Sequence, residues 1–293
     1  MELAFITIIM CMRVLQSIFS KKAAMLIPKG IKSYISYVAT SQFVAAAYSA
    51  ILLACSGDFS GCDGTTILLA ACSGSFLAIN SLCGVKALLG GTLVLNSIFS
   101  TAGLIVPCVL GIFVFDEALS AISLLCIAVV LVGAVLLIDS SKKATGEFSA
   151  KTLFYLVMSF FSNGMVMFFQ KLFGECNPNG NVSMFSMLTF LIPSMALSCV
   201  LLVKKSKNEK LEKFPKMLMV YIMILGFAVF VIQQTVTMLT PVMSAAILFT
   251  IVNGGATVIA AIVGAILYKE KITIKSAAGL LLAIGALIMI KTQ

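Results

Sequence analysis

Long apolar segments recur along almost the whole of this chain, and they constrain its fold more than any other feature. They fall at 3–19, 35–54, 66–86, 91–115, 120–138, 152–173, 182–203, 217–239, 243–267 and 274–290. A helix of about 20 apolar residues is long enough to cross the hydrocarbon core of a bilayer. The sequence therefore predicts an all-α integral membrane protein with ten transmembrane helices, a multi-pass protein of the cell membrane.

The composition agrees with this prediction and excludes large domains outside the membrane. Hydrophobic residues make up 61% of the chain and charged residues 11%, whereas soluble domains are about half apolar and about a quarter charged. The net charge of +9 comes from lysines clustered beside the apolar segments, as is typical of membrane proteins. We therefore expect the lipid bilayer as a partner and no nucleic acid.

The residues needed for most enzymatic and metal chemistry are missing. The chain contains no histidine, and its nine cysteines are scattered without CxxC pairs. Histidine is the commonest general base, and histidine and cysteine are the usual zinc ligands. We expect no metal, no cofactor and no enzymatic activity.

Two short motifs recur at nearly the same spacing in the two halves of the chain. Phe115-Asp116-Glu117, followed by an apolar segment with a glycine, resembles Tyr268-Lys269-Glu270, which comes 153 residues later. Ser20-Lys21 is matched by Gln170-Lys171 after 150 residues. The matches keep their order, so they indicate an internal repeat.

The repeat divides the chain into two units of five segments each. We predict a first five-helix repeat at 1–141, a linker at 142–151 and a second five-helix repeat at 152–293. Because five is an odd number, the two repeats must enter the membrane in opposite orientations. Inverted repeats of this kind suit alternating access to a site near the middle of the membrane.

These residues resemble the drug/metabolite transporter superfamily, and in particular its ten-span EamA-like members. The resemblance rests on the aromatic-x-Glu turn before the last segment of each half, on the glycine in that segment, and on Lys21 and Lys171 at the end of each first segment. It implies export or exchange of small metabolites through a central cavity. The chain departs from the family in lacking the tryptophan common in the first span, and it contains no tryptophan at all.

Arg13 is the most informative single residue. It lies near the middle of the first apolar segment and shares a helical face with Gln16, Ser17 and Ser20. An ionised side chain at that depth costs about 2.5–3.5 kcal/mol on insertion scales, so it is a functional candidate by default. A guanidinium without a protein carboxylate is suited to bind a carboxylate or phosphate through two hydrogen bonds. The alternative is that Arg13 reaches the membrane surface or bonds helix carbonyls and amides.

Further polar side chains lie in other segments, at matching positions of the two halves. Asn163 follows Arg13 by 150 residues, and Gln233 follows Asn80 by 153. We predict that the first, third, fourth, sixth, eighth and ninth segments line a cavity. The candidate substrate-binding residues are Arg13, Gln16, Asn80, Asn96, Asn163, Gln233, Gln234 and Asn253. The alternative for each amide is helix packing.

Small residues and prolines within the segments predict close helix contacts and bends. Gly254-Gly255, Gly264, and Gly103 with Gly111 allow helices to approach closely, and Gly164 beside Asn163 permits close approach or local unwinding. Pro107 and Pro193 are expected to kink their helices.

Two classes of function remain open. The first is a secondary transporter, an exporter or exchanger of small polar metabolites, with anionic or zwitterionic substrates favoured by Arg13. The alternative is a membrane-embedded protein that does not transport, either an enzyme or a scaffold subunit. The partners expected are a small-molecule substrate and lipid; a homodimer is left open.

The lysines give an orientation that conflicts with the one implied by the resemblance. Seventeen of the 20 basic residues lie in or beside the loops that follow odd-numbered segments, including six lysines between 204 and 216. The positive-inside rule places these loops in the cytoplasm and both termini outside it. The family resemblance implies cytoplasmic termini. Both orientations stay open at this stage.

Overall fold

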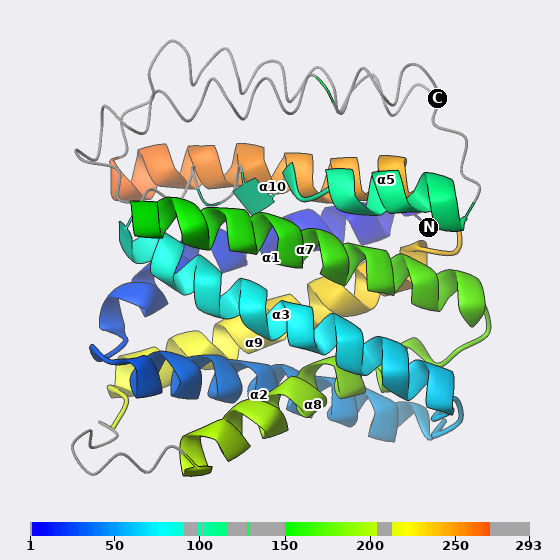
Figure 1. The fold of residues 1–293 in the computed structure, drawn as a ribbon, viewed down its shortest axis with the longest axis horizontal. Helices are drawn as coiled ribbons and strands as arrows, with labels where there is room; N and C mark the ends of the chain where they lie inside the picture. The colour runs from blue at the N-terminus through cyan, green and yellow to red at the C-terminus, as the bar shows by residue number, and fades with distance from the viewer. Residues whose placement is uncertain are drawn as a thin grey trace.

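The computed structural model describes residues 2–90, 96, 99–100, 102–115, 128, 150–203 and 213–269, and within these ranges all regular structure is helical. Figure 1 shows the arrangement. The helices are α1 (Glu2–Leu26), α2 (Ile31–Ser56), α3 (Gly64–Gly90), α5 (Ile105–Val114), α7 (Ala150–Cys176), α8 (Val182–Val203), α9 (Lys216–Leu239) and α10 (Ala245–Tyr268).

Seven of the described helices are long and apolar enough to cross a membrane: α1, α2, α3, α7, α8, α9 and α10. The expectation of an all-helical membrane protein is confirmed to this extent. The segments expected at 120–138 and 274–290 lie outside the described residues, apart from position 128, and the segment at 91–115 is described only in part. The count of ten helices therefore stays a prediction.

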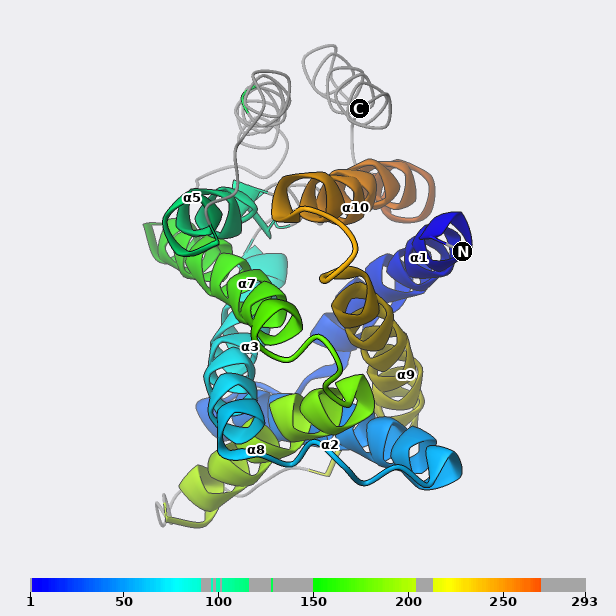
Figure 2. The same cartoon turned by 90° about the vertical axis from the view of Figure 1, so that its right-hand side faces the viewer.

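The long helices pack in pairs drawn from the two halves of the chain. α1 packs on α9, α3 on α7, and α2 on α8. Figure 2 shows α1 with α9 on one side of a central region and α3 with α7 on the other, while α2 and α8 cross at one face and α5 and α10 lie at the opposite face. The core of the protein is thus built almost entirely from contacts between the halves.

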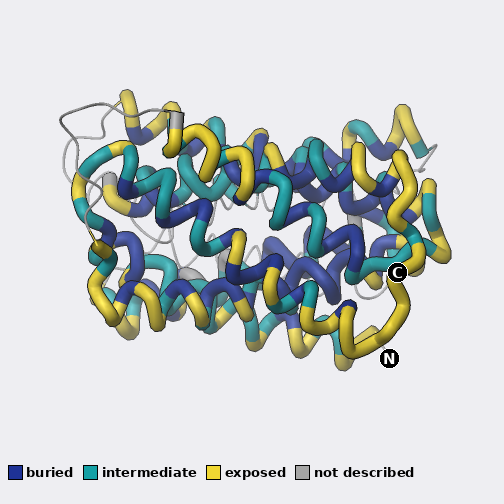
Figure 3. The backbone as a smooth tube through the Cα atoms, turned by 90° about the horizontal axis from the view of Figure 1, so that it is seen from below, coloured by how far each residue is buried: buried dark blue, intermediate teal, exposed yellow. Residues whose placement is uncertain are grey.

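The outward surface of this bundle is apolar, as contact with lipid requires. Figure 3 shows that buried residues face the interior of the bundle and exposed residues its outside. Large apolar side chains such as Phe43, Phe113, Leu202 and Ile266 are among the exposed ones. A water-soluble protein rarely exposes so extensive an apolar surface.

The segment expected as one helix at 91–115 is interrupted. Gly103 and Leu104 form a turn, and α5 begins only at Ile105. The cause is Pro107, which has no N–H and whose ring excludes the carbonyl group four residues earlier, at Gly103. The Gly103 N–H donates to the Ser100 carbonyl oxygen at 3.2 Å. This bond joins residues three apart, as in a 3₁₀-helix, just before the helix ends.

The interrupted segment lies directly against α7. A Cβ atom added at Gly103 would lie 2.6 Å from the carbonyl oxygen of Phe160 and 3.2 Å from the nitrogen of Gly164. Real side chains do not come this close, so the approach of the two backbones depends on glycine at both positions. Close helix approach was expected at Gly103 and at Gly164; the structure shows that these two glycines meet each other.

The two ends of the bundle differ in charge. Every described lysine except Lys171 lies at the end where α1, α3 and α10 finish and α2, α7 and α9 begin, which we call the lysine end (left in Figure 1). The described acidic residues, Glu2, Asp58, Asp63 and Glu175, all lie at the other end, the acidic end. The separation reflects the cost of placing charge within the hydrocarbon.

At the acidic end, the loop between α2 and α3 is held to the loop between α7 and α8. Asn181 Nδ2 donates to the carbonyl oxygen of Asp58 at 2.7 Å, and Asn177 Nδ2 donates to Thr66 Oγ1 at 3.1 Å. We call the Asn181 and Asn177 contacts the loop clamp.

Asp63 caps α3 at the same end of the bundle. Its carboxylate accepts from the Thr66 N–H at 3.2 Å. Hydrogen bonds from Thr65 and Thr66 lower the pKa of Asp63 to about 2, so the cap remains charged at physiological pH.

Lys171, at the same end, is buried. Its side chain is 3% exposed, and its Nζ donates to the carbonyl oxygens of Thr240 (3.0 Å) and Met243 (3.3 Å) just after α9. It also pairs with Glu175 at 2.6 Å. The last carbonyl groups of a helix lack partners within the helix. Lys171 therefore anchors α7 to the end of α9 and satisfies these groups at the same time.

We expect the crossing of α3 and α8 to be sensitive to a single methyl group. A Cβ atom at Gly74 would overlap the carbonyl oxygen of Thr189 and lie 2.8 Å from Pro193 Cδ. Gly74→Ala should therefore lower the melting temperature, since overpacking typically costs about 1–3 kcal/mol. The matched control is Gly64→Ala, where nothing lies within 4 Å of the added atom. Equal melting temperatures of the two variants in detergent would contradict the packing described.

Candidate functional site

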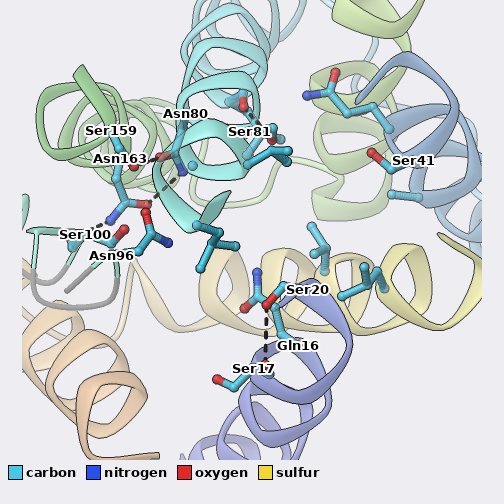
Figure 4. Close-up of a pocket in the computed structure, with 18 of the residues that line it drawn as sticks. Gln16, Ser17, Ser20, Ser41, Asn80, Ser81, Asn96, Ser100, Ser159 and Asn163 are labelled. Atoms are coloured by element: carbon cyan, nitrogen blue, oxygen red, sulfur yellow. Dashed lines mark hydrogen bonds between the residues drawn. The ribbon is translucent and has the colours of Figure 1, made fainter. Parts of the chain in front are cut away.

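A cavity of about 240 Å³ lies in the middle of the bundle. Its lining comes from α1, α2, α3, α7, α8, α9 and α10 and from the residues just before α5. Figure 4 shows its polar side chains arranged around a central space, with Gln16, Ser17 and Ser20 on one side and Asn80, Asn96 and Asn163 on another. The volume is slightly below the usual range of about 300–1,000 Å³ for sites that hold drug-sized ligands. The cavity is suited to a small metabolite.

Arg13 and Gln16 line this cavity together. Arg13 Nη1 donates to Gln16 Oε1 at 2.8 Å, and the pair is partly buried. The two residues are three apart in α1, so the helix itself brings them to one face. Arg13 Nε is buried and has no hydrogen-bond partner within the described structure. The guanidinium is thus oriented by an uncharged amide, which leaves its positive charge unneutralised.

A second polar group joins α3, α7 and the residues before α5. Ser159 Oγ donates to Asn80 Oδ1 at 2.6 Å, and Asn80 Nδ2 is 3.5 Å from Asn163 Oδ1. Asn163 Nδ2 donates to the carbonyl oxygen of Ser100 at 2.8 Å. That carbonyl precedes the turn caused by Pro107 and would otherwise lack its full helical bonding. Asn80 and Asn163 therefore form part of the cavity wall while they hold the interrupted helix.

Asn96 and Asn253 also line the cavity. Asn253 is 4% exposed, and its Nδ2 donates to the Phe249 carbonyl oxygen at 3.1 Å and approaches Met167 Sδ at 3.2 Å. Asn96 Oδ1 is buried without a partner among the described residues. Asn253 is therefore largely engaged in packing, whereas the Asn96 acceptor is unpaired among the described residues.

Gln233 and Gln234 lie outside the lining. Gln234 Nε2 donates to Ser183 Oγ at 2.9 Å, which ties α9 to α8. Gln233 is 7% exposed and lies on α9 about one turn beyond Val229 toward the acidic end. Val229 lines the cavity and Gln233 does not, so depth along the helix, not the helical face, separates Gln233 from the site. The six other candidates, Arg13, Gln16, Asn80, Asn96, Asn163 and Asn253, all line the cavity.

The sequence analysis missed the contribution of α2. Tyr37, Ser41 and Gln42 line the cavity from this helix, and Phe190 does so from α8. The polar residues of α2 form a stripe with helical spacing within an apolar segment, which was a usable signal. The repeat did not reveal this stripe, because it pointed to polar residues that have polar counterparts in the other half. The positions 150 residues after Tyr37, Ser41 and Gln42 hold methionine, leucine and isoleucine.

The cavity occupies the middle of the bundle and the half toward the lysine end. Ser20 and Leu88, near the ends of α1 and α3, lie toward the lysine end, whereas Leu77 and Val229 are among the lining residues farthest toward the acidic end. At the depth of Val229, Tyr48 and Phe230 stack between α2 and α9 with ring centroids 6.2 Å apart. Closer to the acidic end, Phe173 stacks on Phe185 at 4.1 Å. Aromatic side chains and the loop clamp therefore separate the cavity from the acidic end.

Comparison with known proteins agrees with this architecture. Residues 150–292 match the EamA-like transporter family. The second half of the chain is an EamA-like transporter domain. A solved crystal structure of a protein has 12% sequence identity to this chain, with 98% of each chain covered and a TM-score of 0.74. At that identity the likeness concerns the fold alone. A comparison with curated proteins gives no match.

The EamA-like match over the second half of the chain, together with seven apolar helices, supports a multi-pass membrane protein. Within the domain, α7, α9 and α10 supply Asn163, Val229 and Asn253 to the cavity. The remaining lining, including Arg13 and Gln42, comes from the first half of the chain. The cavity is therefore formed between the EamA-like domain and the residues that precede it.

The Asn163 amide should contribute to stability as well as to the cavity wall. Asn163→Leu would leave Asn80 Nδ2 without its partner and remove one of the two hydrogen bonds to the Ser100 carbonyl oxygen. A buried polar group left unpaired costs about 1–3 kcal/mol. We expect a lower melting temperature for the purified variant. Asn179→Leu, the same substitution at an exposed position in the turn after α7, is the control. A melting temperature for Asn163→Leu as high as that of the control would show that the network does not support the fold.

Proposed function

We propose that this protein is a secondary transporter, an exporter or exchanger, of small polar metabolites that are anionic or zwitterionic. The observation that carries the proposal is a polar cavity inside an apolar bundle, with the cationic side chain of Arg13 in its wall. Polar and ionisable side chains are costly in the membrane interior. Their concentration around one cavity is accounted for by a solute that passes through it.

Contacts that recur between the halves support two inverted repeats. Phe115 lies against Phe168, with ring centroids 5.9 Å apart, and Tyr268 donates to the Ile18 carbonyl oxygen at 2.6 Å. Phe115 and Tyr268 are the aromatic residues of the repeated motif, and Phe168 follows Ile18 by 150 residues. A shift of about 150 residues carries α1 onto α7 and α3 onto α9. The contact of α1 with α9 therefore corresponds, in the repeat, to the contact of α7 with α3.

The position of the cavity supports alternating access. In the present conformation its lining extends toward the lysine end, and the loop clamp and the Phe173–Phe185 stack lie on the way to the acidic end. Release toward the acidic end would require these contacts to separate. In transporters with inverted repeats, one bundle commonly rocks against the other around a fixed central site.

The charges around the cavity favour exchange, or coupling through the substrate itself. No aspartate or glutamate is among the described lining residues, so a carboxylate that carries protons through the cavity has no candidate there. The same fact, and the absence of histidine from the chain, argue against the alternative of a membrane-embedded enzyme, because general acid–base catalysis needs such groups. A scaffold subunit would not need a polar cavity.

The lysine end is proposed to face the cytoplasm and the acidic end the outside of the cell. The described lysines all lie at the lysine end apart from buried Lys171, and positively charged loops are retained in the cytoplasm. In this orientation the present conformation faces inward.

The substitution Arg13→Gln tests the role of the guanidinium. If Arg13 binds an anionic group of the substrate, Arg13→Gln should abolish uptake into liposomes, and Arg13→Lys, which keeps the charge but not the planar fork, should transport weakly. The melting temperature should hold or rise, because an amide is less costly than a charge in the membrane. Uptake of labelled carboxylates and amino acids is measured on the same preparations. Wild-type uptake by a folded Arg13→Gln protein would remove Arg13 from the site.

Cysteine labelling tests the orientation. On a background without the nine native cysteines, Ser60→Cys and Lys29→Cys place a thiol at exposed positions of the acidic and the lysine end, respectively. In intact cells, a membrane-impermeant thiol reagent should modify position 60 and spare position 29. The reverse pattern would mean that the termini are cytoplasmic, as the family resemblance implies.

A further inference from the structure

The cavity contains buried polar atoms that have no partner within the protein. Among the described lining residues these are Arg13 Nε, both polar atoms of the Gln42 amide, and Asn96 Oδ1. Buried polar groups are nearly always hydrogen-bonded, and one left unpaired costs about 1–3 kcal/mol. The unpaired groups therefore describe what a bound molecule has to offer.

Gln42 is the most informative of these residues. It lies in the middle of α2, its side chain is 4% exposed, and neither Nε2 nor Oε1 has a partner in the described structure. Asn80 and Asn163, by contrast, bond each other and their neighbours. Gln42 is thus a lining residue whose amide donor and acceptor are both unpaired, which suits a hydroxyl or amide group that can both accept and donate.

The charge of the lining argues against substrates that carry an ammonium group, which are the zwitterionic part of the proposed substrate range. Arg13 is the one charged side chain among the described lining residues. A carboxylate or phosphate would gain a charge-assisted pair of hydrogen bonds from it. An ammonium group in the same cavity would be repelled by Arg13 and would lose its hydration without a counter-charge.

We propose that the cavity binds small hydroxylated organic anions, with the anionic group on Arg13 and a hydroxyl group on Gln42, and that it discriminates against the corresponding zwitterionic amino acids. The proposal rests on the proposed transport function and narrows its substrate class. Gln16 positions the guanidinium from the neighbouring turn, and Asn96 Oδ1 is an acceptor for a second hydroxyl group. Gln42 becomes a specificity-determining residue that the pattern of repeats did not indicate.

Matched pairs of compounds test the substrate class. Glycerate and serine differ by a hydroxyl or an ammonium group at one carbon, and so do malate and aspartate. Glycerol 3-phosphate tests a phosphate in place of the carboxylate, and glycerol tests the neutral skeleton. With the purified full-length protein, the anions should raise the melting temperature, because a ligand stabilises the state that it binds. Serine, aspartate and glycerol should have little effect.

The outcomes separate this inference from the transport function. Equal or larger shifts with serine or aspartate, or no shift with any of the three anions, would overturn the proposed substrate class. Uptake of amino acids but not of hydroxy acids into liposomes would leave transport standing and refute the selectivity. A shift with glycerate that Arg13→Gln abolishes, without uptake of glycerate, would support the binding site and refute transport.

Substitutions test the role of Gln42. Gln42→Met removes the amide at similar size, and the apparent affinity for the anion that stabilises the wild type should fall about tenfold, corresponding to about 1.4 kcal/mol. The matched control is Thr189→Val, which removes a buried hydroxyl that is likewise unpartnered but lies outside the lining. Both variants should keep the wild-type melting temperature without ligand. Equal affinities of Gln42→Met and Thr189→Val would overturn the role of Gln42, even if Arg13 is required.

Discussion

The hydrocarbon core offers no hydrogen-bond partner to a polar group, and this constraint governs the arrangement of the helices in this protein. Its clearest consequence is the hydrogen bond from Asn163 to the Ser100 carbonyl oxygen. The turn at Gly103 and Leu104 interrupts the helix before α5, where the Ser100 carbonyl oxygen accepts from the Gly103 N–H at 3.2 Å. In a membrane such a defect is tolerated only where protein satisfies the freed groups. The Asn163 amide does so, because Gly103 and Gly164 allow the two backbones to approach.

The same constraint explains why the two ends of the bundle are built differently. At the acidic end, Lys171 satisfies the carbonyl groups that follow α9, and the loop clamp joins two loops through asparagine side chains. Aromatic stacking fills the space between this end and the cavity. Toward the lysine end, serine, asparagine and arginine side chains line the cavity instead.

Much of the candidate site could be predicted because polar residues are rare in apolar segments. Arg13 and Gln16 lie on one face of a helix by their spacing alone, and Asn163 corresponds to Arg13 in the repeat. The polar residues of α2 have apolar counterparts in α8, so Gln42 gave no signal in a comparison of repeats. Gln233 shares a helical face with lining residues, but the cavity ends before its depth. Periodicity determines the face of a helix; it does not determine where along the helix a cavity closes.

The sequence alone determined that this chain is a helical membrane protein, where most of its spanning segments lie, and that an arginine is placed among them without a nearby carboxylate. These properties depend on local composition and spacing, which the hydrophobic effect translates directly into spanning helices. Only the tertiary structure decided which polar groups satisfy one another and which remain free. Asn80 and Asn163 are engaged by contacts between α3, α7 and the turn before α5, whereas the Gln42 amide has no partner among the described residues. Hydrogen-bond partners more than 60 residues apart in the chain depend on how the helices cross, and that crossing depends on the packing of all of them together.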